Sequence, residues 1–494
     1  MNVSGFSRQL DSAVIAVFAL VLLRGIVLAA TPLSFDEAYY WLWSKHLAAG
    51  YLDHPPLIAF LIRSGTIIFG DTSTGVRFVP WLLSGIASWA VWRAAIVMTK
   101  SPQAGITAAL LFNVMPMIAV ESGVATPDAP EICAAAFLLL FLAEIAQTRR
   151  GHWWIAAGVA AGFALLAKYT AFFLGAGILL WLAVVPEQRH WFRSAWPYAG
   201  ALIALVMFSP VILWNAQHGW ISFAMQFGRT GAGVFTLRYL GEFLGGQLLL
   251  ATPFIAILAA AGIMFAFRTV AMSDLRLPAC MIVPAAMYFL WHSLHDRVQG
   301  NWPSFLYPAI AVSAAAVYVS AAPHAARILK ISKPLAVPVA AVFVGVIYAQ
   351  AVFGAVPHVR DPVSRLLAYG MGDVVTNIEA LRVREHAAAI VTTNYALTAW
   401  LSFYLPGHPP VIQLNERSRY LNEAPPDPQL FLAPMIYVSQ VRNEQTRYLE
   451  SRFAEVEPLG HVTRTRNGAT IDEYAIYRVE GAGNDVLSFA AHIP

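Results

Sequence analysis

The stretch at residues 34–57, SFDEAYYWLWSKHLAAGYLDHPPL, decides how this chain is interpreted. It follows the first long apolar run and begins with an acidic pair, Asp36 and Glu37. Carboxylates beside a bilayer are costly unless they are paired or functional. The stretch therefore indicates more than a membrane anchor or a channel wall.

The composition predicts a polytopic membrane protein. Of the 494 residues, 58% are hydrophobic and 12% charged, whereas soluble proteins carry roughly 25% charged residues. The formal net charge is +4, but no basic patch with interleaved aromatic residues is present, so nucleic acid is not an expected partner. The two cysteines, Cys133 and Cys280, both fall in apolar runs, which argues against a disulfide framework or a cysteine metal site.

Apolar runs long enough to cross a hydrocarbon core of roughly 30 Å predict about eleven membrane helices. The first lacks a small-residue cleavage site and is expected to be retained. Residues 152–167 and 170–185 are short, and both two full spans and a re-entrant hairpin around Lys168 fit them. The predicted spans are 12–30, 76–98, 103–120, 130–147, 152–167, 170–185, 197–214, 247–267, 279–293, 303–320 and 335–353.

Lysine and arginine mark alternate loops, which predicts the orientation of the chain. Arg8 precedes the first span, and with a cytoplasmic N-terminus the basic loops fall on the same side as this residue. The opposite side is the periplasm in a bacterium. It then holds the loops 31–75, 121–129, 215–246 and 294–302.

The C-terminal part differs from the rest in composition. From about residue 357 the charges are dense, and short alternating segments predict strands at 389–393, 435–438 and 474–479. Helical periodicity appears near 374–386 and 444–453. We therefore predict a polytopic α-helical membrane domain over residues 1–356 and a small soluble α/β domain, on the periplasmic side, over residues 357–494.

The acidic pair has a functional and a structural interpretation. Asp36 suits a general base or charge stabiliser at the membrane surface. Glu37 stands three residues after Ser34, the spacing of a capping box, and both interpretations can hold together. Tyr39 opens an aromatic stretch that is also typical of an interfacial helix.

Other polar residues of the outer loops are candidates for the same site. Asp53 and His54 precede two prolines that fix the turn, and His54 suits a phosphate or simply a surface turn. Asp128 either shares a site with Asp36 or caps the next helix. Lys168, between two apolar runs, needs a phosphate or carboxylate partner unless it snorkels.

The loop at 292–303, HSLHDRVQGNWP, supplies further candidates. Arg297 suits a phosphate, because its planar fork donates two hydrogen bonds and stays charged. His295 lies three residues after His292, but this spacing is a weak metal signal and no metal site is predicted. Asn301 either supports the site or begins the next helix. Motifs for nucleotide phosphate loops and serine hydrolases are absent.

These loops together resemble GT-C glycosyltransferases of the polyprenyl-phosphate-sugar-dependent branch. That branch includes protein O-mannosyltransferases and the bacterial enzymes that add aminoarabinose or galacturonic acid to lipid A and core. Five matching segments run in family order over roughly the first 350 residues: FDEAYYW at 35–41, DHPPL at 53–57, TPDAP at 126–130, LAKYT at 166–170 and GNWP at 300–303. The tail segment FYLPGH at 403–408 also resembles bacterial members.

The resemblance implies catalytic roles for Asp36, Glu37 and Asp128, with Asp53 in support. His54 stands where the aminoarabinose transferases carry lysine, so Lys168 and Arg297 are expected to help bind the donor phosphate. The implied reaction moves a sugar from a polyprenyl-phosphate donor to a glycolipid or protein acceptor at the bilayer surface. No cofactor is expected, and a divalent cation stays open.

Two other classes compete with this interpretation. A secondary transporter or flippase is compatible with Lys168 and the outer carboxylates, but transporters often show inverted repeats and the sequence has no evident repeat. An envelope scaffold with a C-terminal binding module is disfavoured by the clustered polar residues of the loops.

Overall fold

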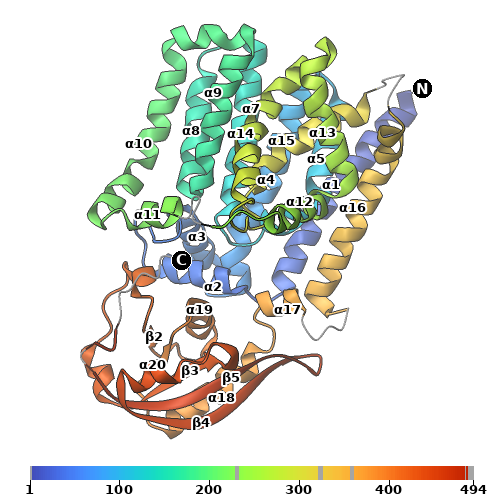
Figure 1. Cartoon of the computed structure of the whole chain (residues 1–494). Helices are drawn as coiled ribbons and strands as arrows, with labels where there is room; N and C mark the ends of the chain where they lie inside the picture. Colours follow the sequence, from blue (N-terminus) through green and yellow to red (C-terminus); the bar gives the residue numbers. More distant parts are fainter. Residues whose placement is uncertain (1–2, 229–232, 321–325, 356–360, 484, 488–494) are drawn as a thin grey trace. The chain divides into compact units, whose positions relative to one another are not determined.

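The computed structural model describes residues 3–228, 233–320, 326–355, 361–483 and 485–487, and it leaves out the side chains of residues 3–11 and 271. The side chain of Arg8 and the predicted boundary at residue 357 therefore lie outside the described part. The chain divides into two compact units (Figure 1). The first is Met1–Ile26, His54–Ile58 and Arg77–Ile347, and the second is Val27–Asp53, Ala59–Val76 and Tyr348–Pro494.

The first unit is a bundle of helices. Four helices, α1 (Val3–Ala30), α3 (Leu57–Phe69), α4 (Ser73–Thr99) and α16 (Arg327–Phe353), contribute residues to both units. The other helices of the first unit are α5 (Pro102–Val114), α6 (Pro116–Glu121), α7 (Asp128–Thr148), α8 (Trp153–Ala167), α9 (Phe172–Val184), α10 (Ala195–Gln217), α11 (Ile221–Gly228), α12 (Arg238–Ala251), α13 (Pro253–Arg268), α14 (Arg276–His292) and α15 (Tyr307–Val319).

Small residues let these helices approach closely. Helices α8 and α10 lie side by side (Figure 1), and a Cβ added to Gly158 would stand 2.3 Å from the carbonyl oxygen of Gly200. Helix packing in a bilayer has little hydrophobic driving force, so it favours small residues that bring backbones together. The buried core of this unit is accordingly rich in alanine.

Five helices among the described residues are long and apolar enough to cross a membrane, and seven if two bent pairs each count as one span. The five are Ser12–Ala30, Ser73–Thr99, Asp128–Thr148, Ala195–Gln217 and Arg327–Phe353. Each coincides with a predicted span, which confirms a polytopic helical membrane protein. Helix α8 has 15 residues, a length of roughly 22 Å, and therefore falls short of a roughly 30 Å hydrocarbon core.

Two predicted spans are not single straight helices. The span predicted at 247–267 is broken between α12 and α13, which are bent by 99°. Thr252 there has a positive φ of 66° and precedes Pro253, which has no N–H to continue the hydrogen-bond ladder. The span predicted at 103–120 is likewise divided into α5 and α6, because Met115 is extended before Pro116.

The second unit contains a five-stranded mixed sheet of order β2-β1-β3-β5-β4. Strands β1 and β3 are parallel, as are β1 and β2, whereas β5 runs antiparallel to β3 and β4. The strands are β1 (Ala389–Thr392), β2 (Val411–Gln413), β3 (Met435–Gln440), β4 (Phe453–Arg466) and β5 (Ala469–Ala482). All residues of β1 are buried, as expected for a strand with neighbours on both sides.

Four helices pack on this sheet: α17 (Pro362–Leu366), α18 (Met371–Arg384), α19 (Tyr395–Tyr404) and α20 (Thr446–Glu450). The N-terminal helix α2 (Phe35–Lys45) and most of α3 (Leu57–Phe69) belong to the same unit. Helix α2 packs on α19, and α19 packs on β1 and β2. The three strands predicted from sequence are confirmed by their overlap with β1, β3 and β5, and the helix predicted at 374–386 overlaps α18, which ends at Arg384.

Candidate active site

Asp36 lies in the first turn of α2 and precedes Glu37, which takes part in the N-terminal cap of this helix. The backbone N–H of Glu37 donates to the Ser34 hydroxyl at 3.2 Å, and the Ser34 N–H donates to the Glu37 carboxylate at 2.9 Å. This is the capping box that the sequence predicts. Glu37 is fully buried. The Glu37 carboxylate therefore caps the N-terminus of α2. Asp36 is the member of the acidic pair that remains a candidate for acid–base catalysis.

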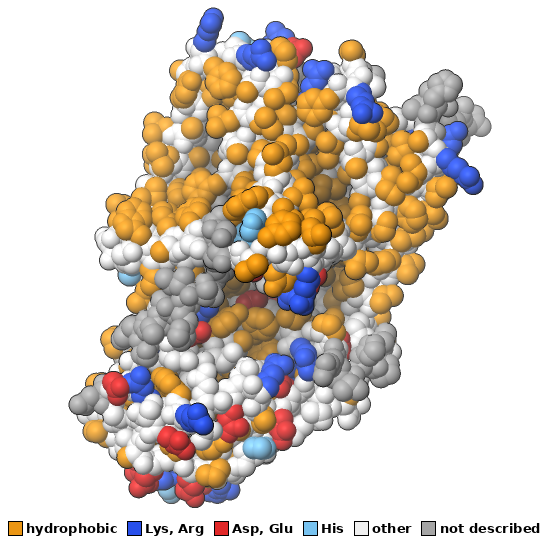
Figure 2. All heavy atoms as spheres, in the orientation of Figure 1, with side chains coloured by type: hydrophobic (Ala, Val, Ile, Leu, Met, Phe, Trp, Pro, Cys, Tyr) orange, Lys and Arg blue, Asp and Glu red, His pale blue; other side chains and the backbone are white. Residues whose placement is uncertain are grey.

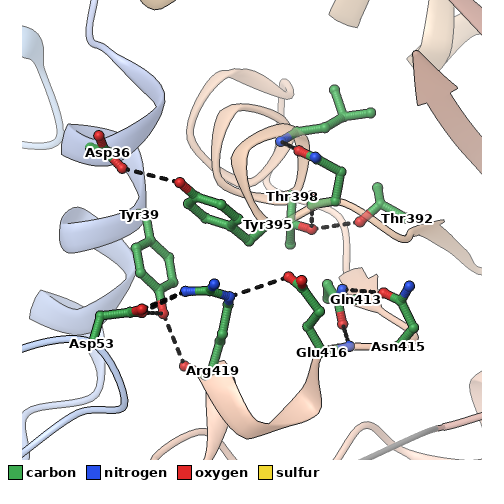
Figure 3. A network of polar contacts seen from close by, with 12 residues as sticks. Asp36, Tyr39, Asp53, Thr392, Tyr395, Thr398, Gln413, Asn415, Glu416 and Arg419 are labelled. Carbon is green, nitrogen blue, oxygen red and sulfur yellow. Dashed lines mark hydrogen bonds and ion pairs between the residues drawn. The ribbon is translucent and has the colours of Figure 1, made fainter. Parts of the chain in front are cut away.

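The half-buried Asp36 carboxylate accepts a hydrogen bond from the C-terminal sheet region. The Tyr395 hydroxyl donates to Asp36 Oδ1 at 3.4 Å, as Figure 3 shows. Tyr395 opens α19, where Asn394 caps the helix by accepting from the Leu397 N–H at 3.0 Å. The N-cap of α19 therefore also helps to fix the position of Tyr395, the first residue of this helix.

A second carboxylate, Asp53, is paired within the same network. Arg419 Nη1 lies 2.7 Å from both oxygens of Asp53, and the Tyr39 hydroxyl donates to Asp53 Oδ2 at 2.8 Å. Arg419 Nε donates to Glu416 at 3.2 Å, so one guanidinium holds two carboxylates (Figure 3). Asp53 is therefore engaged in an ion pair, which favours a supporting role over direct attack.

The aromatic rings of this network form the walls around Arg419. Its guanidinium lies 4.4 Å from the Tyr395 ring centroid and 6.0 Å from that of Tyr39. The two rings meet edge to face with centroids 5.2 Å apart. Tyr39 thus belongs to the site's framework, and the aromatic stretch of α2 is largely buried.

The electrostatics of Asp36 suit a general base. Burial raises the pKa of Asp36 to about 7, and the carboxylates of Asp53 and Glu37 act in the same direction. The hydrogen bond from Tyr395 and the charge of Arg419 lower that pKa and only partly compensate. A base whose pKa lies near the working pH is the most effective in proton transfer.

A second polar centre lies in the first unit, around Asp128. Its Oδ1 accepts from Lys168 Nζ at 2.9 Å and from the Ser304 hydroxyl at 2.6 Å. Its Oδ2 accepts from Lys168 Nζ at 3.0 Å and from Asn301 Nδ2 at 3.0 Å. The Asp128 and Lys168 side chains are only 2% and 6% exposed. The sequence prediction that Lys168 needs an anionic partner is met by a carboxylate.

The alternative that Asp128 caps a helix is wrong. Helix α7 begins at Asp128 itself, after Pro127, and has no side-chain cap hydrogen bond. The carboxylate is instead turned to the chain reversal at Lys168, which follows α8 in an extended conformation, and to the segment before α15. Four hydrogen bonds from three donor groups, Lys168, Asn301 and Ser304, engage both oxygens of this carboxylate, which favours an organising role.

Glu131 and Thr170 belong to this centre but were missed by the sequence prediction. Thr170 donates to Glu131 Oε1 at 2.5 Å, and Glu131 is fully buried. Glu131 stands three residues after Asp128 on α7, a spacing that puts both on one face of the helix. The three-residue spacing of Glu131 from Asp128, together with the position of Thr170 two residues after Lys168, could have predicted that both residues belong to this centre. Ser304 gave no such signal, because its partner lies far away in sequence.

Three of the predicted site residues remain, Arg297, His295 and His54. Arg297 pairs with Glu242 through Nε and Nη2, each at 2.9 Å, and is about half exposed. His295 is half-buried on the same loop, and His54 is half-buried where the Pro55 turn begins. Within the described residues, no group of three or more His, Cys, Asp or Glu side chains is arranged to hold a metal ion.

The family comparison matches residues 53–214, a segment that includes Asp53, His54, Asp128 and Lys168, to the dolichyl-phosphate-mannose-protein mannosyltransferase family. Lipid A galacturonosyltransferase RgtD of Rhizobium johnstonii is 29% identical over 210 residues, which cover 42% of this chain and 44% of RgtD. The undecaprenyl phosphate-alpha-4-amino-4-deoxy-L-arabinose arabinosyl transferase of Pseudomonas aeruginosa is 27% identical over 180 residues, 35% of this chain and 32% of the relative. The matches thus span less than half of these relatives.

Solved structures extend the likeness over the whole fold. ArnT from Cupriavidus metallidurans, bound to undecaprenyl phosphate, superposes with a TM-score of 0.68 at 14% identity, over 97% of this chain and 98% of ArnT. Arabinofuranosyltransferase AftD from Mycobacteria gives 0.52 at 14% identity, over 96% of this chain and 40% of AftD. The fold is therefore ArnT-like. Residues 53–214 match the dolichyl-phosphate-mannose-protein mannosyltransferase family, and the resemblance of the chain to polyprenyl-phosphate-sugar-dependent GT-C glycosyltransferases is confirmed.

Proposed function

We propose that the chain is an integral membrane glycosyltransferase that moves a sugar from a polyprenyl-phosphate donor to an envelope acceptor. The carrying observation is Asp36, a carboxylate with a pKa near 7 held by Tyr395 within an ArnT-like fold. The names of the relatives support a donor of the undecaprenyl-phosphate type and lipid A as the acceptor. Core oligosaccharide, another glycolipid or a protein are the other acceptors to be tested.

The proposed reaction is a single displacement. The acceptor hydroxyl attacks the anomeric carbon while its proton passes to Asp36, and the bond from that carbon to the lipid phosphate breaks. The phosphate leaves with the bonding electron pair, so the configuration at the anomeric carbon inverts. Because the negative charge grows on the phosphate, cationic donors beside it stabilise the transition state.

Lys168, Arg297 and His54 are the proposed phosphate-binding residues. An ammonium group has three donors, and the contacts of Lys168 with the two Asp128 oxygens leave capacity for an anionic ligand. We assign Asp128 the task of orienting Lys168, with Asn301 in support. Arg297 is paired with Glu242. On donor binding, Arg297 would either leave Glu242 for the donor phosphate or bind both groups at once.

The finer topology belongs to the same proposal. We propose about eleven spans, a cytoplasmic N-terminus and a periplasmic domain over residues 357–494 after a membrane domain over 1–356, in the bacterial inner membrane. Cys133 and Cys280 are buried, so single added cysteines can be labelled selectively. An impermeant maleimide should label Glu444→Cys in intact spheroplasts and label Arg149→Cys only after lysis. The reverse result would invert the orientation.

The activity is tested by reconstituting the purified protein with radiolabelled undecaprenyl-phosphate aminoarabinose or galacturonic acid and lipid A. Asp36→Asn should abolish the release of undecaprenyl phosphate while the protein still folds. Asp373→Asn, an exposed aspartate on α18, is the matched control and should behave as wild type. Near-normal transfer by Asp36→Asn would refute the assignment. Movement of labelled donor across the bilayer without transfer would instead support the flippase alternative.

A further inference from the structure

The partners of the N-terminal carboxylates come from far along the chain. Tyr395, which donates to Asp36, lies 359 residues away in sequence, and Arg419, which pairs with Asp53, lies 366 residues away. All four residues belong to the same compact unit. The C-terminal region is thus in direct contact with the proposed base.

The topology explains why these two residues arrive together. Strands β1 and β2 are parallel neighbours, so their carboxyl ends lie at one edge of the sheet. Tyr395 follows β1, and Arg419 lies in the short helix η5 (Arg417–Tyr420) that follows β2. Side chains at the carboxyl ends of adjacent parallel strands converge, which is why open α/β sheets use that edge for their sites.

The loop after β2 is built to present Arg419. The Glu416 N–H donates to the Gln413 side-chain oxygen at 2.6 Å, and Gln413 in turn donates to Asn415 at 2.6 Å. Glu416 then accepts from Arg419 (Figure 3). The guanidinium is therefore held by its own loop as well as by Asp53, which reduces the conformational entropy lost when the site forms.

The contacts of Asp36 divide its two oxygens between two tasks. Oδ1 accepts from Tyr395, whereas no hydrogen bond reaches Oδ2 in the part of the chain that the structure describes. The charged and titratable groups facing Asp36 are Glu37 of α2, Asp53, Tyr395 of α19 and Arg419 of η5. Oδ2 is thereby left to accept the proton of the acceptor hydroxyl.

We propose that Tyr395 and Arg419 are positioning residues for the transfer reaction, which makes the C-terminal sheet region part of the catalytic apparatus. Tyr395 orients Asp36 and stabilises its ionised form. Arg419 neutralises Asp53, which would otherwise repel the ionised base. This inference rests on the proposed function, since it concerns the same carboxylate. The alternative is that these contacts only fasten the C-terminal region to α2.

A pH profile of kcat/KM separates the two roles, because its acid limb reports the ionisation of the free base. Tyr395→Phe removes a donor to the ionised carboxylate, so the midpoint of the acid limb should shift to higher pH by about half a unit. About a third of the wild-type kcat/KM should then remain at pH 6. Asp53→Asn removes a repelling charge, so the limb should move down by about half a unit, with about two- to threefold more activity at pH 6 relative to its own plateau.

Matched controls keep this test specific. Tyr448→Phe removes a hydroxyl that has no hydrogen-bond partner among the described residues, and Asp472→Asn neutralises a carboxylate paired with Arg442 at 3.3 Å. Neither should move the limb. The positioning role would be overturned if Tyr395→Phe and Asp53→Asn lose the same fraction of the rate at every pH and the acid limb does not shift. The contacts would then only attach the C-terminal region to α2.

A readout other than transfer distinguishes failure of this inference from failure of the proposed function. The carboxyl infrared band that disappears in Asp36→Asn reports the ionisation of Asp36 in the full-length protein without any donor. If no donor is transferred but this band titrates near pH 7 and shifts in opposite directions in Tyr395→Phe and Asp53→Asn, only the proposed function fails. An infrared titration unchanged in both variants would refute the positioning of Asp36.

Discussion

Replacing Lys168 by methionine should strongly destabilise the first unit. The change keeps a long apolar stem but removes the charged partner of Asp128, whose carboxylate is almost fully buried. Breaking a buried ion pair by removing one partner costs about 3–5 kcal/mol, because the other charge is left uncompensated. Asn301 and Ser304 still donate to Asp128, so we expect the lower end, about 3 kcal/mol.

The chain offers an exposed pair of the same chemistry as a control. Lys45 and Asp71 are 2.6 Å apart, but their side chains are 27% and 37% exposed. Exposed ion pairs contribute about 0–1 kcal/mol, so Lys45→Met should change the free energy of unfolding by no more than that. Both variants can be compared with wild type by reversible unfolding of the detergent-solubilised protein with sodium dodecyl sulfate.

A double variant tests the cause of the loss. Lys168→Met leaves the charge of Asp128 without its cationic partner, and Asp128→Asn removes that charge. The double variant should therefore be about 1–2 kcal/mol more stable than the sum of the two single changes in unfolding free energy predicts, as expected for coupled neighbours. The reasoning is refuted if Lys168→Met is no more destabilising than Lys45→Met. It is also refuted if the two single effects at Asp128 and Lys168 simply add.

Three further predictions concern separate sites. Glu37→Ala should destabilise the unit that contains α2 by about 1 kcal/mol because it removes half of the capping box, whereas Glu37→Gln should cost less; equal melting curves would contradict this. Burial raises the pKa of Glu423 from 4.5 to about 7, so the folded state retains a proton between these values and stability falls as pH rises through them. Glu423→Gln should therefore be more stable than wild type at pH 8, with a smaller difference at pH 5, in thermal melts at both pH values. Arg297→Ala should raise the KM for the lipid-linked donor about tenfold with little change in kcat, while Arg238→Ala, which removes the other partner of Glu242, should not; an unchanged donor KM in Arg297→Ala would exclude its phosphate role.

Sequence reasoning succeeded where the decisive interactions are local. The membrane helices follow from long apolar runs, and the capping box follows from Ser34 and Glu37 three residues apart. Strands β1 and β3 were predicted from short alternating segments, and both form in the sheet with a neighbour on each side. In these cases a window of a few residues contains all the physical information that selects the structure.

It failed where the partner is distant or the local signal is ambiguous. Tyr395 and Arg419 carry no motif, and only the parallel pairing of β1 with β2 brings them to Asp36 and Asp53. Strand β4 was missed because its residues are mostly exposed and mixed in character. The helix predicted at 444–453 is confined to α20, since Phe453 already begins β4.

The separation of Tyr395 from Asp36 has a consequence for biogenesis. A ribosome adds roughly 5–20 residues per second, so the 359 residues between the two side chains take roughly 20–70 seconds to synthesise. Throughout that interval a nascent chain with its first helices already inserted presents Asp36 without its tyrosine donor. Under the proposed function, Asp36 would therefore reach its final orientation and ionisation only after the C-terminal region has been synthesised and folded, so that full transfer activity follows assembly of the whole chain.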